Sequence, residues 1–75
     1  MKIDKKKILQ IVSKHTKVQL KTIKENSSTD NIQTWDSLAH IRIILELQKL
    51  TNIKIPTSSF GQFNSIKTLN KKFKK

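Results

Sequence analysis

The chain has 75 residues, no cysteine, one glycine and one proline, and a net charge of +11 at neutral pH. This length supports one domain with a single modest core, taken here as residues 1–75, and is too short for an enzyme that encloses a deep substrate cavity. The missing cysteine excludes disulfides, thiolate metal sites and cysteine nucleophiles, and we expect no metal site of another kind. Scarce glycine and proline argue against a turn-rich β fold and a glycine-built phosphate loop, so the sequence predicts an all-α protein.

The first helix is predicted to start near Lys5 and to end within residues 15–17. Asp4 is its expected N-cap, because a carboxylate can accept hydrogen bonds from the free amides of a first helical turn. Ile3 and Ile8 stand at the positions of a hydrophobic staple around that cap. Four residues recur at helical spacing and mark the buried side, with the last of them at the edge of the core: Ile8, Ile11, Val12 and His15.

Residues 18–35 are predicted to form a long ordered loop with a few isolated apolar anchors. A connection of this length exceeds the usual link between bundle helices, so the loop is either functional or partly disordered. Trp35 closes the loop. It could brace the loop against the next helix or shield a group attached nearby, but the favoured interpretation is an ordinary half-buried aromatic side chain.

The central helix is predicted over Asp36 to Leu50, where apolar residues cover most of the circumference. Its polar strip is narrow, because Arg42, Glu46 and Lys49 are spaced i, i+4 and i+7 and fall on one line. We expect this strip to face water or a partner and the remaining positions to pack.

Two further helices follow an extended link that ends at Pro56. Thr57 or Ser58 is the expected cap of a short helix that includes Phe60 and Phe63. Asn64 or Ser65 is the expected cap of the last helix, which has three apolar residues at i, i+3 and i+7: Ile66, Leu69 and Phe73.

The run Trp35-Asp36-Ser37-Leu38, the apolar helix after it and Lys54-Ile55-Pro56 resemble the acyl carrier protein family, in its discrete stand-alone form. The family places an Asp-Ser-Leu tripeptide at the start of its second helix and an Ile-Pro pair beyond that helix. The resemblance covers residues 30–70. It implies a small four-helix bundle with a long loop between the first two helices and a short third helix.

The resemblance also implies the roles of three residues. Ser37 would carry covalent 4'-phosphopantetheine, Asp36 would assist its transfer, and Leu38 would complete the attachment motif and begin the core-facing side of the helix. A phosphate at Ser37 would also meet the free amides and positive dipole end of a helix. The structural alternative is that Asp36 is only an N-cap and Ser37 an ordinary first helical residue.

The implied partners are a phosphopantetheinyl transferase and enzymes that activate and transfer acyl or aminoacyl groups, as in fatty acid, polyketide or nonribosomal peptide biosynthesis. The chain would hold these groups as thioesters, act as a monomer and catalyse nothing itself. Side chains that could shelter an acyl chain between the second and third helices, with core packing expected for most, are Ile41, Ile44, Leu45, Phe60, Phe63 and Ile66.

The charge of the central helix departs from the family. Housekeeping members carry an acidic second helix, whereas Arg42 and Lys49 here are relieved only by Glu46, so we expect partners with acidic or apolar docking surfaces. Ser37 is not expected to be a catalytic nucleophile, because a hydrolase would need a base and an oxyanion hole inside a sheltered cleft. His15 and His40 are the only imidazoles in the chain. His40 could touch the attached group or a partner, although an ordinary surface or packing histidine is favoured.

The positive charge is peripheral: residues 1–29 carry +6, residues 61–75 carry +5 and residues 30–60 carry none. A basic helical module that binds nucleic acid is therefore the alternative function. Fifteen of the sixteen basic residues are lysines, however, whereas base readout favours arginine, so we expect no nucleic-acid partner. An unmodified structural subunit is a third possibility. No segment reaches the roughly 20 apolar residues that span a bilayer, and a cytoplasmic protein is expected.

Overall fold

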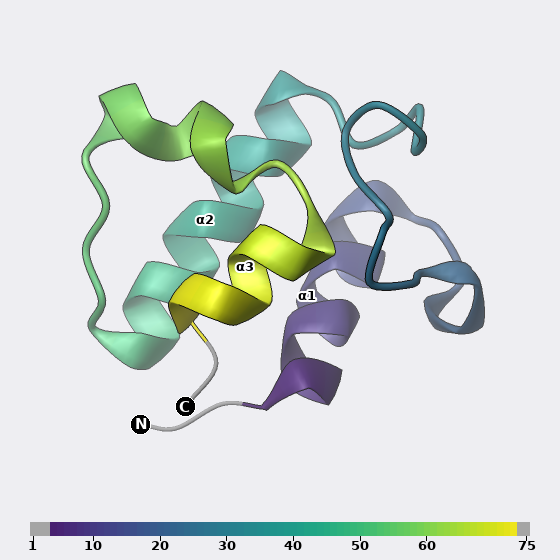
Figure 1. The fold of residues 1–75 in the computed structure, drawn as a ribbon, viewed down its shortest axis with the longest axis horizontal. Helices are drawn as coiled ribbons and strands as arrows, with labels where there is room; N and C mark the ends of the chain where they lie inside the picture. Colours follow the sequence, from purple (N-terminus) through teal and green to yellow (C-terminus); the bar gives the residue numbers. More distant parts are fainter. Residues whose placement is uncertain (1–3, 74–75) are drawn as a thin grey trace.

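The computed structural model describes residues 4–73, and Figure 1 shows their arrangement. The helical segments are α1 (Lys5–Thr16), η1 (Leu20–Thr22), α2 (Ser37–Thr51), η2 (Thr57–Phe63) and α3 (Ile66–Phe73), where η denotes a 3-10 helix. Residues 4–73 contain no β-strand, and one isolated antiparallel bridge joins Ser28 to Ser65. The all-α prediction is confirmed. No helix in this range is long and apolar enough to cross a membrane.

Aspartates start the two longest helices. The side chain of Asp4 accepts a hydrogen bond from the Lys7 amide at 2.9 Å, and that of Asp36 accepts one from the Ala39 amide at 2.9 Å. Each bond satisfies one of the amides that a first turn leaves without a carbonyl partner. The predicted bounds of α1 are confirmed, and α2 is shifted by one residue at each end. The predicted staple partner Ile3 lies outside the described residues.

The last two helices begin in different ways. The predicted side-chain cap of η2 is wrong, because the segment begins at Thr57 directly after an extended Pro56, with no capping hydrogen bond from a side chain. Proline has no amide hydrogen and fixes φ, so it can lead into a helix. The cap predicted at Ser65 is confirmed: its hydroxyl accepts from the Thr68 amide, and the Thr68 hydroxyl accepts from the Ser65 amide, both at 3.2 Å.

The core lies where α1, α2 and α3 meet. The helix α1 packs against α2 and α3, and η2 contacts α2 and α3. Trp35 is 1% exposed, so the expectation of a half-buried ring is wrong. Full burial of a large apolar side chain contributes about 1.5 to 3 kcal/mol. The other fully buried apolar side chains are Ile8, Ile11, Val12, Ile43, Ile44, Leu47, Ile66, Leu69 and Phe73.

The loop between α1 and α2 is held against the start of α3. The Thr29 amide donates to the Asn64 carbonyl, and the Ile66 amide donates to the Ser27 carbonyl, each at 3.0 Å. Within the loop, the Asn31 side chain accepts from the Ser28 amide at 2.8 Å. These bonds replace the backbone pairing that a helix would supply. The predicted long loop is present, except that η1 forms a single 3-10 turn within it, and the loop brings the start of α2 close to the η2–α3 junction.

Candidate functional site

Ser37 is the first residue of α2 and is exposed to solvent. The Asp36 side chain accepts a hydrogen bond from the Ala39 amide, and the Asp36 carbonyl accepts one from the His40 amide at 2.9 Å. The amides of Ser37 and Leu38 are therefore without a hydrogen-bond acceptor at the positive end of the helix dipole. The position combines a reachable hydroxyl with two free backbone donors.

Hydrogen bonds between buried groups hold together the segments that surround Ser37. The Trp35 indole donates to Nδ1 of His40 at 3.0 Å, and Nε2 of His40 lies 2.7 Å from the Phe60 carbonyl oxygen. Indole nitrogen only donates and a carbonyl only accepts, so His40 must accept at Nδ1 and donate at Nε2. Both ring nitrogens are engaged within the fold, which confirms the packing role and ties the loop, α2 and η2 together.

A shallow pocket of about 360 Å³ opens beside Ser37, where the loop, α2 and η2 converge. A Cβ atom placed on Gly61 would meet nothing within 4 Å, so this wall faces open space. The pocket has room for the root of a group attached at Ser37, and its lining offers hydroxyl, amide and carboxylate groups beside the buried rings. The lining residues are Thr29, Trp35, Asp36, Ser37, His40, Gly61 and Asn64.

The expectation that Leu38 faces the core is wrong. Leu38 is 57% exposed, and Ile41 and Leu45 on the same side of α2 are 43% and 51% exposed. Neighbouring elements cover only one side of α2, and these three residues at i, i+3 and i+7 lie on the other. They do not join the core, whereas Ile44, Phe60 and Ile66 do. Of the six residues considered for an acyl pocket, Ile41 and Leu45 are exposed and Phe63 is half-buried against the core. Core packing is confirmed for the remaining three.

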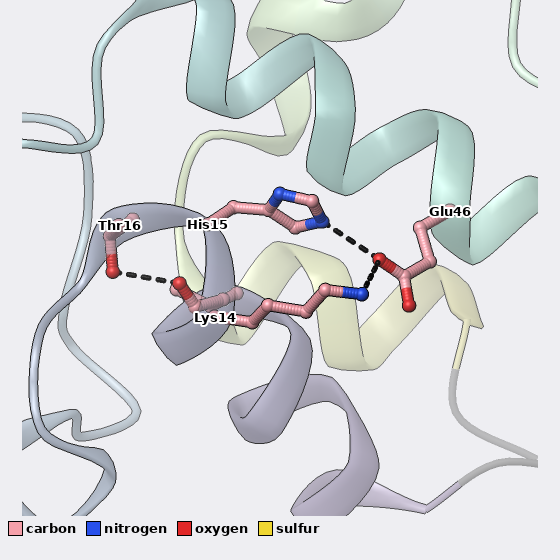
Figure 2. A network of polar contacts seen from close by, with 5 residues as sticks. Lys14, His15, Thr16 and Glu46 are labelled. Atoms are coloured by element: carbon pink, nitrogen blue, oxygen red, sulfur yellow. Dashed lines mark hydrogen bonds and ion pairs between the residues drawn. The ribbon is translucent and has the colours of Figure 1, made fainter.

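Glu46 points toward α1, as Figure 2 shows. Its Oε1 atom lies 2.7 Å from Nε2 of His15 and 3.4 Å from Nζ of Lys14. Burial acts to raise the pKa of this carboxyl, but the hydrogen bonds and positive charges of His15 and Lys14 outweigh it and hold the pKa below its usual value. Of the predicted polar strip, Arg42 and Lys49 are exposed, while Glu46 is half-buried and paired across to α1.

The contacts of His15 with Glu46 and of His40 with Phe60 could not be predicted from the sequence. His15 and Glu46 are 31 residues apart, and His40 and Phe60 are 20 apart, so helical spacing relates neither pair. Trp35 and His40 are close in sequence, but Trp35 precedes the N-cap of α2. Helical spacing therefore does not relate its side chain to that of His40. A tryptophan just before a cap and a histidine in the following turn form the one local signal available.

No protein-family model and no curated protein sequence matches this chain. The fold defines a small all-α domain with an exposed serine at the start of its central helix.

Proposed function

We propose that this protein is a carrier to which 4'-phosphopantetheine is attached through the Ser37 hydroxyl. The observation that supports the proposal most is the position of Ser37: it is exposed, it starts α2, and it borders an open pocket. A phosphodiester there would be stabilised by the helix dipole and by the remaining first-turn amides, those of Ser37 and Leu38. The sequence resemblance to acyl carrier proteins points to the same residue.

The chain's own residues have limited tasks in this function. Asp36 fixes the start of α2 through its bond to the Ala39 amide, which sets where the Ser37 hydroxyl lies. Trp35 and His40 hold the loop and η2 in place behind it. When attached, the arm supplies a thiol that holds acyl or aminoacyl groups as thioesters, and its tether raises their local concentration at partner enzymes. Loading falls to a phosphopantetheinyl transferase, and the carrier needs no catalytic group.

The test is loading of purified protein with coenzyme A and a broad-specificity phosphopantetheinyl transferase, followed by intact mass. We expect the wild type to gain one phosphopantetheine and Ser37→Ala to gain none. Circular dichroism should show Ser37→Ala folded, because an exposed hydroxyl without an internal hydrogen bond contributes little stability. A wild-type protein that gains no mass at Ser37 would overturn the proposal.

Asp36→Asn is the matched control for the attachment motif. Asparagine caps a helix about as well as aspartate, so the unfolding midpoint should stay close to that of the wild type. If Asp36 assists transfer through its charge, loading of this variant slows while the fold is retained. Unchanged loading would restrict Asp36 to its capping role.

A further inference from the structure

Exposed lysines from three segments surround Glu25 on the side where α1 and α3 pack together (Figure 1). The Glu25 carboxylate lies 3.9 Å from Nζ of Lys5 in α1, and the Glu25 carbonyl accepts a hydrogen bond from the Lys67 amide in α3 at 3.2 Å. Lys24 directly precedes Glu25 in the loop. Lys71 lies one turn after Lys67, on the same side of α3. We call this group the lysine face, and its members are Lys5, Lys24, Lys67 and Lys71.

The positive charge of the lysine face is largely uncompensated. Within residues 4–73, Glu25 pairs only with Lys5, and the other three lysines of the face form no ion pair. The carboxylate of Asp4, the residue before Lys5, is already engaged as the cap of α1. The three unpaired ammonium groups are therefore available to anions from outside the chain.

The residue types of the lysine face favour a bilayer over a nucleic acid as the anionic partner. All four cations are lysines, which meet phosphates as point charges, whereas nucleic-acid recognition favours the fixed bidentate geometry of arginine. Binding of single strands relies on exposed aromatic rings, but Trp35, Phe60 and Phe73 are buried. A bilayer with anionic lipids attracts clusters of about four or more lysines and requires no shaped groove.

The lysine face is separate from the start of α2. The pocket beside Ser37 has no lysine in its lining. His15, in the last turn of α1, borders a hollow together with Asp36, so the end of α1 and the start of α2 adjoin. Lys5 is at the other end of α1, and a helix of 12 residues is about 18 Å long. A membrane beneath the lysine face therefore need not cover Ser37.

We propose that the lysine face binds the surface of a membrane that contains anionic lipids, with the ammonium groups of Lys24, Lys67 and Lys71 on the lipid phosphates. Electrostatic attraction holds the protein there, because the face consists of lysines and inserts no apolar side chain. The protein then lies on the membrane with the Ser37 hydroxyl open to water. This inference does not depend on a group attached at Ser37.

The first experiment measures cosedimentation of the unmodified full chain with lipid vesicles. The protein should bind vesicles of equal parts phosphatidylcholine and phosphatidylglycerol, and not vesicles of phosphatidylcholine alone. Raising NaCl from about 0.1 M to about 1 M shortens the screening length from about 10 Å to about 3 Å and should release it. Equal binding to both kinds of vesicle, binding that resists salt, or no binding at the lower salt concentration would overturn the proposal.

Two double variants with the same net charge locate the binding surface. Lys67→Glu with Lys71→Glu should weaken binding to the phosphatidylglycerol vesicles about tenfold or more, since each lysine near an anionic surface contributes about fivefold. The matched control, Arg42→Glu with Lys49→Glu, changes two exposed cations of α2 and should bind nearly as tightly as the wild type. Both variants lower the net charge from +11 to +7. Equal losses in the two would reduce the effect to net charge and contradict the proposal.

A paramagnetic lipid determines how the protein lies on the vesicle. With a gadolinium-chelating lipid in the phosphatidylglycerol vesicles, amide NMR signals should broaden most at Lys24, Lys67 and Lys71 and least at the start of α2. Strongest broadening at Ser37 would overturn the proposal, as would tighter binding of duplex DNA than of these vesicles. The loading assay is independent of these measurements: a protein that binds vesicles but gains no mass loses the carrier function alone, and a loaded protein that ignores vesicles loses only the lysine-face interaction.

Discussion

His40 is the residue through which three segments meet. His40 belongs to α2. It accepts a hydrogen bond from the Trp35 indole in the loop and donates one to the Phe60 carbonyl in η2. All three groups are buried, so each bond replaces one to water that the fold has removed. This arrangement holds the loop and η2 on either side of Ser37.

Replacing His40 by leucine should destabilise the protein more than an ordinary surface change. The substitution leaves the Trp35 N–H and the Phe60 carbonyl buried without partners, which should lower the free energy of unfolding by about 2 to 4 kcal/mol. Urea unfolding followed by circular dichroism measures the loss. A double-mutant cycle with Trp35→Phe should show a coupling of about 1 kcal/mol, because these two residues share one bond. A leucine variant as stable as the wild type would contradict the bonded role of His40.

At the scale of elements, α2 has one covered side and one open side. Ile44 is fully buried, while its neighbour Leu45 is half exposed. The helix sequence is apolar almost all round, and that composition alone does not reveal which residues are covered.

Adjacent alanine substitutions distinguish the two sides of α2. Ile44→Ala should lower the free energy of unfolding by about 2 to 5 kcal/mol, since it opens a cavity in the core. Leu45→Ala should change it by no more than about 0.5 kcal/mol. Urea unfolding of both variants checks the pair, and similar losses for the two would show that Leu45 is covered.

The contact of α1 with α2 through Glu46 should depend on pH. The pKa of Glu46 is lower in the folded chain than its ordinary 4.5, so the carboxylate's contribution is fully present above that value. It is lost as the pH falls through the folded-state pKa. Glu46→Gln should therefore be less stable than wild type near neutral pH, by up to about 1 kcal/mol for a partly exposed pair.

Urea midpoints measured at successively lower pH provide the check. The difference between wild type and Glu46→Gln should shrink toward zero below pH 4.5. Lys14→Met should have the smaller effect, because Lys14 lies at 3.4 Å from the carboxylate and His15 at 2.7 Å. A gap that widens in acid would mean that the pKa of Glu46 is raised.

At the scale of the whole molecule, repulsion between the excess positive charges destabilises the folded state. The described chain measures 27 × 25 × 17 Å and the protein carries +11. Electrostatic screening extends over about 30 Å at 0.01 M salt, so at low salt nearly all charges repel one another across the fold. Only three ion pairs occur within residues 4–73, and they relieve little of this repulsion.

The protein should therefore become more stable when salt is added. Raising NaCl from about 0.01 M to about 0.15 M shortens the screening length to about 8 Å and should raise the free energy of unfolding. Lys67→Glu with Lys71→Glu lowers the net charge from +11 to +7 and should show a smaller rise. Denaturation by urea, which is uncharged, measures both. Stability that falls with salt would show that favourable ion pairs outweigh the repulsion.

The sequence by itself determined the three α-helices, with their ends to within one residue, but not η1 or the start of η2. Asp4, Asp36 and Ser65 cap helices as predicted, because capping depends on a side chain and amides within the same turn. The exposed place of Ser37 at a helix start follows from that local chemistry. The residues that determine these features are close together in the chain, so their spacing is enough to find them.

Only the tertiary structure decided which side of α2 is covered, whereas helical spacing already predicted the buried sides of α1 and α3. Leu38 and Leu45 are as apolar as Leu47, yet only Leu47 has neighbouring elements packed over it. The same packing turned Glu46 toward α1, buried Trp35 and joined His40 to Phe60. These outcomes depend on contacts between segments that are far apart in the sequence. Neither local hydrophobicity nor helical period predicts which of these contacts form.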